Sequence, residues 1–260
     1  MDVTTLLSQH WGTLSWFIPL VICISILKTP AAKGYLGELL VRFFIWLQLD
    51  DKTYHRVHNV TLDTPDGTTQ IDHVIVSMYG IFVLETKNMR GWIFGSERQP
   101  QWTQKRFKRT FKFQNPLRQN YKHLKALEAT LEVAPEHLHS IITFVGDSTF
   151  KTEMPPNVTH GSRFIRYIKS FTQPVFTASE VDTLVQTLLD GRRAPSLATH
   201  REHVENLKRR SDPTADRQCP KCGSALLVRT IKTGDTTSES AGLHRRLMFT
   251  RATAASNAIP

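Results

Sequence analysis

The first part of the chain is apolar and carries no charge between Asp2 and Lys28. Small or weakly polar residues and one proline are the only interruptions of the apolar run at residues 11–27. A helix of this length spans about 25 Å, a little less than the ~30 Å hydrocarbon core of a bilayer. The pattern favours a membrane anchor over residues 1–30. The alternatives are a buried core helix and a signal peptide, although the basic segment that opens a signal peptide is missing.

The charges on either side of the apolar run predict its orientation. Basic residues follow it from Lys28 onward, whereas the only charged residue before it is Asp2. Under the positive-inside rule, the chain that follows the run lies in the cytoplasm. The sequence therefore predicts a single-pass protein of the inner (cytoplasmic) membrane, attached through residues 11–27.

The hydrophobic period after the anchor is helical at first and then becomes that of strands. Residues 33–49 predict a strongly apolar helix in which Glu38 is either a solvated surface residue or a carboxylate directed toward a site. Turn residues at 64–67 and 78–80 then separate segments of β-branched and apolar residues. The predicted strands are 57–62, 69–77, 81–86 and 91–95.

The following part of the chain alternates helices and strands. Asn115 and Pro116 form a helix N-cap and first turn, and Thr177 and Glu180 form a capping box for a helix that ends at Gly191. The other predicted elements are strands at 140–145 and 163–168 and a basic helix at 195–210. The predicted domains are the anchor at 1–30, a core at 31–150, elements that complete the core at 151–210, and a linker and tail at 211–260.

The chain has 33 Lys and Arg against 23 Asp and Glu, and this net charge of +10 favours a polyanionic partner such as nucleic acid or an anionic membrane. Residues 98–125 hold nine of the basic side chains and no acidic one, with aromatic residues between them. This composition fits a groove that follows a nucleic-acid backbone and stacks bases. The alternatives are a solvated face with its aromatic rings packed inward, and adhesion to anionic lipid. The candidate binding residues are Lys105, Arg106, Lys108, Arg109, Lys112 and Arg118.

Two carboxylates are predicted to face each other on neighbouring strands. A two-residue loop at 78–79 places Asp72 opposite Glu85, and a loop shifted by one residue places it opposite Lys87. Both acids lie in apolar, β-branched segments, where uncompensated charge is costly. A bound cation explains such a pair, and oxygen ligands suit Mg²⁺ or Mn²⁺. Lys87 is placed to orient a water molecule or to stabilise charge on a phosphate.

Five separated motifs give the chain a resemblance to a known family. They are GTTQIDHV at 67–74, YGIFVLETKN at 79–88, GWIFG at 91–95, WTQ at 102–104 and FQNPLRQNY at 113–121. Together they resemble the nuclease-related domain (NERD) family, which is grouped with the PD-(D/E)xK, restriction-endonuclease-like nucleases. The resemblance implies an α/β fold with a restriction-endonuclease-like core behind the N-terminal transmembrane helix. That core consists of a helix, a three-stranded antiparallel meander, a helix and a strand.

The resemblance also implies roles for individual residues. Gln104 and Gln119 match polar positions of the later motifs, and Gln119 is counted with the nucleic-acid-binding residues. Ile71 stands where the PD-(D/E)xK motif has its proline. This difference does not change the position of the acid that follows, Asp72. The residues implied in catalysis are Lys87, Glu85, Asp72 and the helix-borne Glu38, and those implied in metal binding are Asp72, Glu85 and the carbonyl of Thr86.

These features predict a membrane-anchored nuclease that depends on Mg²⁺ or Mn²⁺ and acts on nucleic acid, DNA rather than RNA. Because a fold by itself does not establish an activity, two other hypotheses stay open. One is a module with an endonuclease-like fold that binds nucleic acid without cleaving it. The other is a scaffold at the membrane surface.

Three cysteines are too few for a disulfide framework, and two of them form a Cys-x-x-Cys pair near the C-terminus. Cys219 and Cys222 resemble the first half of a topoisomerase-type four-cysteine zinc ribbon. A second pair of ligands is missing, and His244 is the one later candidate, so Zn²⁺ binding by this chain is not expected. The prediction for 211–260 is a linker, half a ribbon and a disordered tail.

Overall fold

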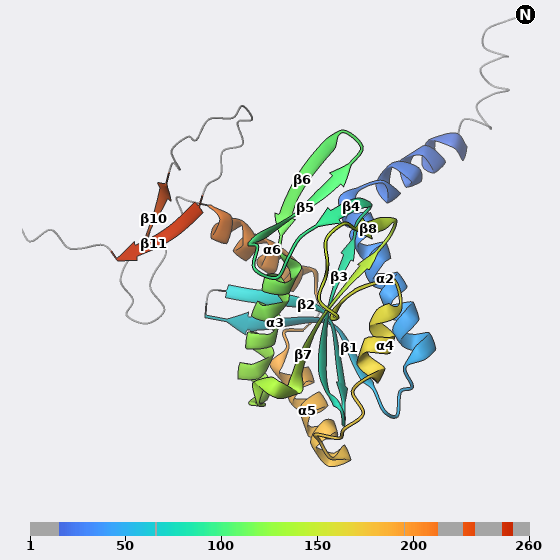
Figure 1. Cartoon of the computed structure of the whole chain (residues 1–260), viewed down its shortest axis with the longest axis vertical. Helices are drawn as coiled ribbons and strands as arrows, with labels where there is room; N and C mark the ends of the chain where they lie inside the picture. The colour runs from blue at the N-terminus through green and yellow to red at the C-terminus, as the bar shows by residue number, and fades with distance from the viewer. Residues whose placement is uncertain (1–15, 66, 195, 213–225, 232–245, 252–260) are drawn as a thin grey trace, which may run out of the picture. The chain divides into compact units, whose positions relative to one another are not determined.

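The computed structural model describes residues 16–65, 67–194, 196–212, 226–231 and 246–251. The chain divides into two compact units, one formed by residues 1–62 and 69–193 and the other by residues 63–68 and 194–260. The larger unit is a mixed α/β structure with two sheets (Figure 1). It contains every predicted catalytic and nucleic-acid-binding residue.

A five-stranded sheet forms the centre of the larger unit. Its strands, in their order across the sheet, are β1 (His55–Thr64), β2 (Gly67–Ser77), β3 (Gly80–Asn88), β7 (Leu138–Val145) and β9 (Val158–His160). A tight turn at Met78 and Tyr79 joins β2 to β3, and these two strands pair in antiparallel orientation. β7 runs parallel to both β3 and β9. The predicted strands at 57–62, 69–77, 81–86 and 140–145 are confirmed.

Three helices of the larger unit, α2 (Pro30–Gln48), α3 (Pro116–Leu131) and α5 (Ala178–Gly191), begin at residues whose side chains cap them. Another helix, α4 (Arg163–Lys169), has no side-chain cap, and a 3₁₀ turn spans Pro135–His137. Thr29 caps α2 and Asn115 caps α3, each followed by a proline in the first turn. The predicted capping box of Thr177 and Glu180 opens α5.

The prediction of a strand at 163–168 is wrong, because these residues form α4. Phe164, Ile165 and Ile168 are buried, and Arg163 and Arg166 are exposed. Positions 164, 165 and 168 lie on one side of a helix, so this spacing buries all three apolar side chains together. A strand would have directed Phe164 and Ile165 to opposite faces of the sheet.

The alternating side chains of the strands build a separate core on each face of the central sheet. Val74 and Val83 pack with α3 and α5, whereas Ile75 and Leu84 pack with residues of α2 and α4. Figure 1 shows the two pairs of helices on opposite faces. The end of β3 therefore lies between α2 and α3, the two helices that carry predicted site residues.

A second sheet packs beside the central one. Its order is β6 (Arg109–Gln114), β5 (Gln101–Arg106), β4 (Gly91–Phe94) and β8 (Ser148–Phe150). β4 confirms the predicted strand at 91–95, but the β5–β6 hairpin was not evident from the sequence pattern. Trp102 of β5 is buried and stacks on Phe144 of β7, with 6.1 Å between ring centroids and 8° between ring planes. This contact attaches the hairpin to the central sheet.

The N-terminal helix Trp16–Leu27 meets α2 at an angle of 74°. Within the described residues, neither helix alone has the length and apolar character needed to cross a membrane, whereas the bent pair together meets that requirement. The predicted anchor is residues 1–30, with its apolar run at 11–27, and residues 1–15 lie outside the part of the chain that the structure describes.

The smaller unit contains α6 (Leu197–Ser211) and the antiparallel pair of β10 (Leu226–Ile231) and β11 (Arg246–Arg251). α6 confirms the predicted basic helix. Within this unit, Thr68 Oγ1 lies 2.9 Å from His203 Nδ1. The predicted half zinc ribbon, with Cys219 and Cys222, lies outside the described residues.

Candidate functional site

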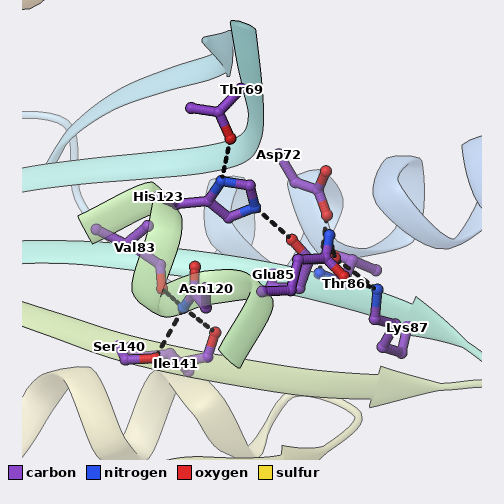
Figure 2. A network of polar contacts seen from close by, with 11 residues as sticks. Thr69, Asp72, Val83, Glu85, Thr86, Lys87, Asn120, His123, Ser140 and Ile141 are labelled. Atoms are coloured by element: carbon purple, nitrogen blue, oxygen red, sulfur yellow. Dashed lines mark hydrogen bonds and ion pairs between the residues drawn. The ribbon is translucent and has the colours of Figure 1, made fainter. Parts of the chain in front are cut away.

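The tight turn between β2 and β3 brings the two predicted acids side by side. The strands pair from Ser77 with Gly80 to His73 with Leu84, and Asp72 and Glu85 are the next residues along the two strands. At this position the backbone N–H of Thr86 donates to Asp72 Oδ2 at 2.8 Å (Figure 2). The structure therefore has the register of the two-residue loop and not the register shifted by one residue.

Glu85 is buried, and both of its carboxylate oxygens are hydrogen-bonded. Lys87 Nζ donates to Glu85 Oε1 at 2.7 Å and to Gln119 Oε1 at 2.8 Å, and Gln119 Nε2 donates to Glu85 Oε1 at 2.7 Å. Glu85 Oε2 lies 3.2 Å from His123 Nε2, and His123 Nδ1 lies 2.8 Å from Thr69 Oγ1 (Figure 2). An ionised carboxylate can only accept hydrogen bonds. A neutral His123 therefore carries its proton on Nε2, where it donates to Glu85, and its Nδ1 accepts a hydrogen bond from the Thr69 hydroxyl.

Asn120 holds α3 against the strands that carry these groups. Its Nδ2 donates to the carbonyl of Val83 at 2.8 Å, to the hydroxyl of Ser140 at 2.9 Å and to the carbonyl of Ile141 at 3.3 Å (Figure 2). These acceptors belong to β3 and β7. The contacts therefore set the position of α3, and with it the hydrogen bonds that the helix makes to Glu85.

The surroundings of the two acids change their pKa values in opposite directions. Burial first, and then the negative charges of Glu85 and Glu38, raise the pKa of Asp72 well above its usual 3.8. Burial also opposes the ionisation of Glu85, but Lys87 and His123 together hold the pKa of this carboxyl below its usual 4.5. The surroundings therefore favour the ionised form of Glu85 and the protonated form of the adjacent Asp72.

The raised pKa of Asp72 predicts that Asp72→Asn stabilises the metal-free protein at high pH. The folded chain holds the Asp72 proton more tightly than the unfolded chain does, so stability is lost as the pH rises from 3.8 through the raised pKa. We expect a gain of about 1 kcal/mol at pH 8, the size of a partly screened charge interaction, or about 2–4 °C in Tm. Melting in EDTA at pH 8 and at pH 4 checks this.

The gain should shrink at pH 4, where the parent is also protonated at Asp72. Asp182→Asn on α5 is the matched control, because it removes an exposed carboxylate far along the sequence from the site. Equal effects of the two variants at pH 8, or a lower Tm for Asp72→Asn at that pH, would contradict the prediction.

The structure places two other predicted residues at the margins of the carboxylate cluster. Glu38 lies on α2, 3.9 Å from Arg42, and is close enough to Asp72 to raise the pKa of that carboxyl. Gln104 lies on β5, and its Nε2 donates to the backbone carbonyl of Arg90 at 2.8 Å. Gln119 is thus the predicted glutamine that hydrogen-bonds within the cluster.

The basic candidates gather on the β5–β6 hairpin and at the start of α3. Phe107 is 92% exposed at the hairpin turn and Phe111 is 47% exposed, whereas Trp102 is buried and Phe113 packs against the core. The aromatic residues of the hairpin are therefore divided between an outward pair and an inward pair. The exposed basic residues are Lys105, Arg106, Lys108, Arg109, Lys112 and Arg118.

Sequence reasoning missed three polar residues of the site, namely His123, Asn120 and Thr69. One signal was available for His123, because it follows Gln119 by four residues and so lies on the same side of a helix. Thr69 carries no such signal, since only the packing of α3 on the sheet brings it to His123.

The donor set suits a hard divalent ion that keeps part of its water shell. Asp72, Glu85 and the carbonyl of Thr86 would offer oxygen ligands, and Mg²⁺ usually takes one or two carboxylates and retains several waters. No group of three or more His, Cys, Asp or Glu side chains in the described part of the chain could enclose an ion. Burial and the nearby carboxylates disfavour the charged form of Asp72, and a bound cation would offset both effects. These residues therefore fit Mg²⁺ or Mn²⁺ better than a closed zinc site.

The fold and the site define a mixed α/β domain with a carboxylate and lysine cluster on adjacent strands. Residues 33–145 match the nuclease-related domain family, NERD. An uncharacterized protein of Bacillus anthracis is 39% identical over 166 residues, which are 62% of this chain and 77% of that relative. The chain belongs to the nuclease-related domain family, and this membership indicates a nuclease-related function. No solved structure matches the chain.

Proposed function

We propose that this protein is a Mg²⁺-dependent nuclease that hydrolyses phosphodiester bonds of nucleic acid, with DNA as the expected substrate. The observation that carries the proposal is the convergence of Asp72, Glu85 and Lys87 in one cluster at adjacent strands. A nuclease-related domain and an exposed basic hairpin support the same class of substrate.

Lys87 is the group proposed to orient the attacking water. Its ammonium group has three N–H donors, of which Glu85 and Gln119 accept two, and the third can reach a water or a phosphate oxygen. Gln119 is hydrogen-bonded to both Lys87 and Glu85 and so fixes the positions of these two side chains relative to each other. A Mg²⁺ ion held by Asp72, Glu85 and the carbonyl of Thr86 would stabilise negative charge on the phosphate.

The second candidate function is nucleic-acid binding without cleavage. The ion pair between Lys87 and Glu85 favours it, because this pair compensates the buried carboxylate without any metal. A protein with this ion pair can keep its fold and its basic surface even when it has no cleavage activity.

A cleavage assay of the full chain in non-ionic detergent tests the proposal. Labelled DNA and RNA are incubated with Mg²⁺, Mn²⁺ or EDTA, with Glu85→Gln as the inactive variant. We expect cleavage with either metal, faster for DNA, and none in EDTA or in the variant. Binding of both nucleic acids with no cleavage would support the second function, and cleavage in EDTA would contradict metal dependence.

The basic hairpin predicts nucleic-acid binding that depends on salt. Replacing Lys105, Arg106, Lys108 and Arg109 together by alanine should lower the affinity at low salt. It should also reduce the slope of log affinity against log salt by about 0.7 per lost phosphate contact on a single strand, or about 0.9 on a duplex. The affinity for Mn²⁺, measured by calorimetric titration, should be unchanged. An unchanged salt slope would place the nucleic acid on another surface.

We also propose attachment to the inner membrane in a single pass, with the domain in the cytoplasm. The helix Trp16–Leu27 supports this proposal because its large apolar side chains are exposed, from 81% for Trp16 to 41% for Ile24. Lys28 and Lys33 follow on the proposed cytoplasmic side. Membranes from cells that express the full chain should retain it through carbonate and high-salt washes, and release in either wash would contradict the attachment.

A further inference from the structure

A hollow of about 470 Å³ lies beside the bend between the helix Trp16–Leu27 and α2. Its apolar lining comes from Ile24, Leu27 and Leu36 of these two helices and from Met89, which follows β3. Among the described residues that line it, none is acidic and four are cationic. The cationic residues are Lys28 and Lys33 near the bend, Arg90 before β4, and Arg106 at the end of β5.

The apolar lining continues along the outward side of α2. Every exposed α2 residue between 31 and 47 is uncharged, whereas the side chains of Glu38 and Arg42 are about three-quarters covered. Tyr35 and Trp46, which lie toward opposite ends of the helix, are 59% and 65% exposed. Leu39, Leu40, Phe43 and Leu47 are the other large apolar side chains exposed along this side.

A contiguous exposed apolar surface of this kind marks a site that binds a partner. The four cationic side chains require an anionic partner. By charge alone, this partner is either the phosphate of a lipid or the phosphate of a nucleic acid. The aliphatic lining favours the lipid, because a phospholipid joins its phosphate directly to acyl chains. The helix Trp16–Leu27, whose exposed apolar side is continuous with the hollow, points to the same partner.

We propose that this hollow binds the phosphate headgroup of an anionic phospholipid, with the outward side of α2 in contact with the acyl chains. The inference rests on the proposed membrane attachment and goes beyond it, because it assigns selectivity for lipid charge to Lys28, Lys33, Arg90 and Arg106. Tyr35 and Trp46 then lie where aromatic side chains commonly anchor a helix at the membrane interface.

Calorimetric titration of the full chain in non-ionic detergent tests this proposal. The probes are short-chain phosphatidylglycerol and phosphatidylcholine with identical acyl chains, so that only the headgroup charge differs. We expect phosphatidylglycerol to bind about tenfold more tightly. The double variant Lys28→Gln with Arg90→Gln should lose about this factor for phosphatidylglycerol alone.

Two further variants separate charge from apolar contact. Lys122→Gln with Lys125→Gln removes the same charge from the exposed side of α3 and should leave both affinities unchanged. Leu36→Asn should weaken both lipids alike. Thermal melting confirms that each variant is folded, and the comparison of the two lipids on the parent chain needs no variant.

Several results would overturn the proposal. Equal affinity for the two lipids would remove the selectivity, and displacement of the lipid by equimolar inorganic phosphate would show a simple anion site. Displacement by a short oligonucleotide would assign the hollow to nucleic acid. Dimers that dissociate on Leu39→Asn would show that a second copy covers α2. Carbonate extraction tests attachment separately, so its failure is distinguishable from failure of the lipid preference.

Discussion

Replacing Lys87 by alanine is expected to lower nucleic-acid cleavage by about 100- to 10,000-fold, the range for loss of a group that assists proton transfer, while Mn²⁺ binding survives. The lysine contacts Glu85 and Gln119 and has no role as a metal ligand. Its removal takes away the largest of the interactions that oppose the effect of burial and leaves His123, so the pKa of the Glu85 carboxyl should rise. The Mn²⁺ titration should therefore be made near pH 8, because a higher pH favours the ionised carboxylate that binds the metal.

The measurement is a calorimetric Mn²⁺ titration beside the cleavage assay, on the parent, Lys87→Ala and Lys125→Ala. Lys125 is an exposed lysine that pairs with Glu128 on α3, so its loss controls for overall charge. Loss of Mn²⁺ binding in Lys87→Ala at pH 8, or cleavage equal to that of the parent, would exclude the assigned role. Metal binding that survives removal of both Asp72 and Glu85 would exclude the site itself.

The second large effect is expected at Trp102. Trp102→Ala should cost about 3–5 kcal/mol of unfolding free energy, as for other buried aromatic residues. The ring is fully buried, stacks on Phe144, and its Nε1 donates to the carbonyl of Ser96 at 2.9 Å. Phe107→Ala, in contrast, should change stability by less than about 0.5 kcal/mol because the ring is exposed. It should weaken single-stranded DNA binding by about 1–3 kcal/mol if a base stacks there.

Chemical denaturation and DNA titration of the two variants separate these roles. The structure predicts a stability defect with Trp102→Ala and a binding defect with Phe107→Ala. A strongly destabilised Phe107→Ala would contradict the outward position of that ring. A stable Trp102→Ala would contradict the packing that attaches the hairpin to the central sheet.

Much of the site could be predicted because its key residues are close in the sequence. Asp72 and Glu85 flank a turn of two residues, and the period of a strand then puts Glu85 and Lys87 on the same side of β3. The turn residues, Asn115 at the start of α3 and the capping box of α5 act over a few residues, so their effects are readable without the fold. The strand predicted at 163–168 failed because a segment of seven residues suits either period.

The strands around the turn, the helix caps, the identity of the acids and lysine, and the basic character of residues 98–125 all follow from local sequence. The partners of Glu85 depend instead on the packing of α3, because Gln119 and His123 reach it from more than thirty residues away and Asn120 holds that helix in place. Tertiary packing also decides which aromatic residues of the hairpin are buried. Local conformational preference determines an element, whereas the neighbours of a side chain depend on how distant elements pack.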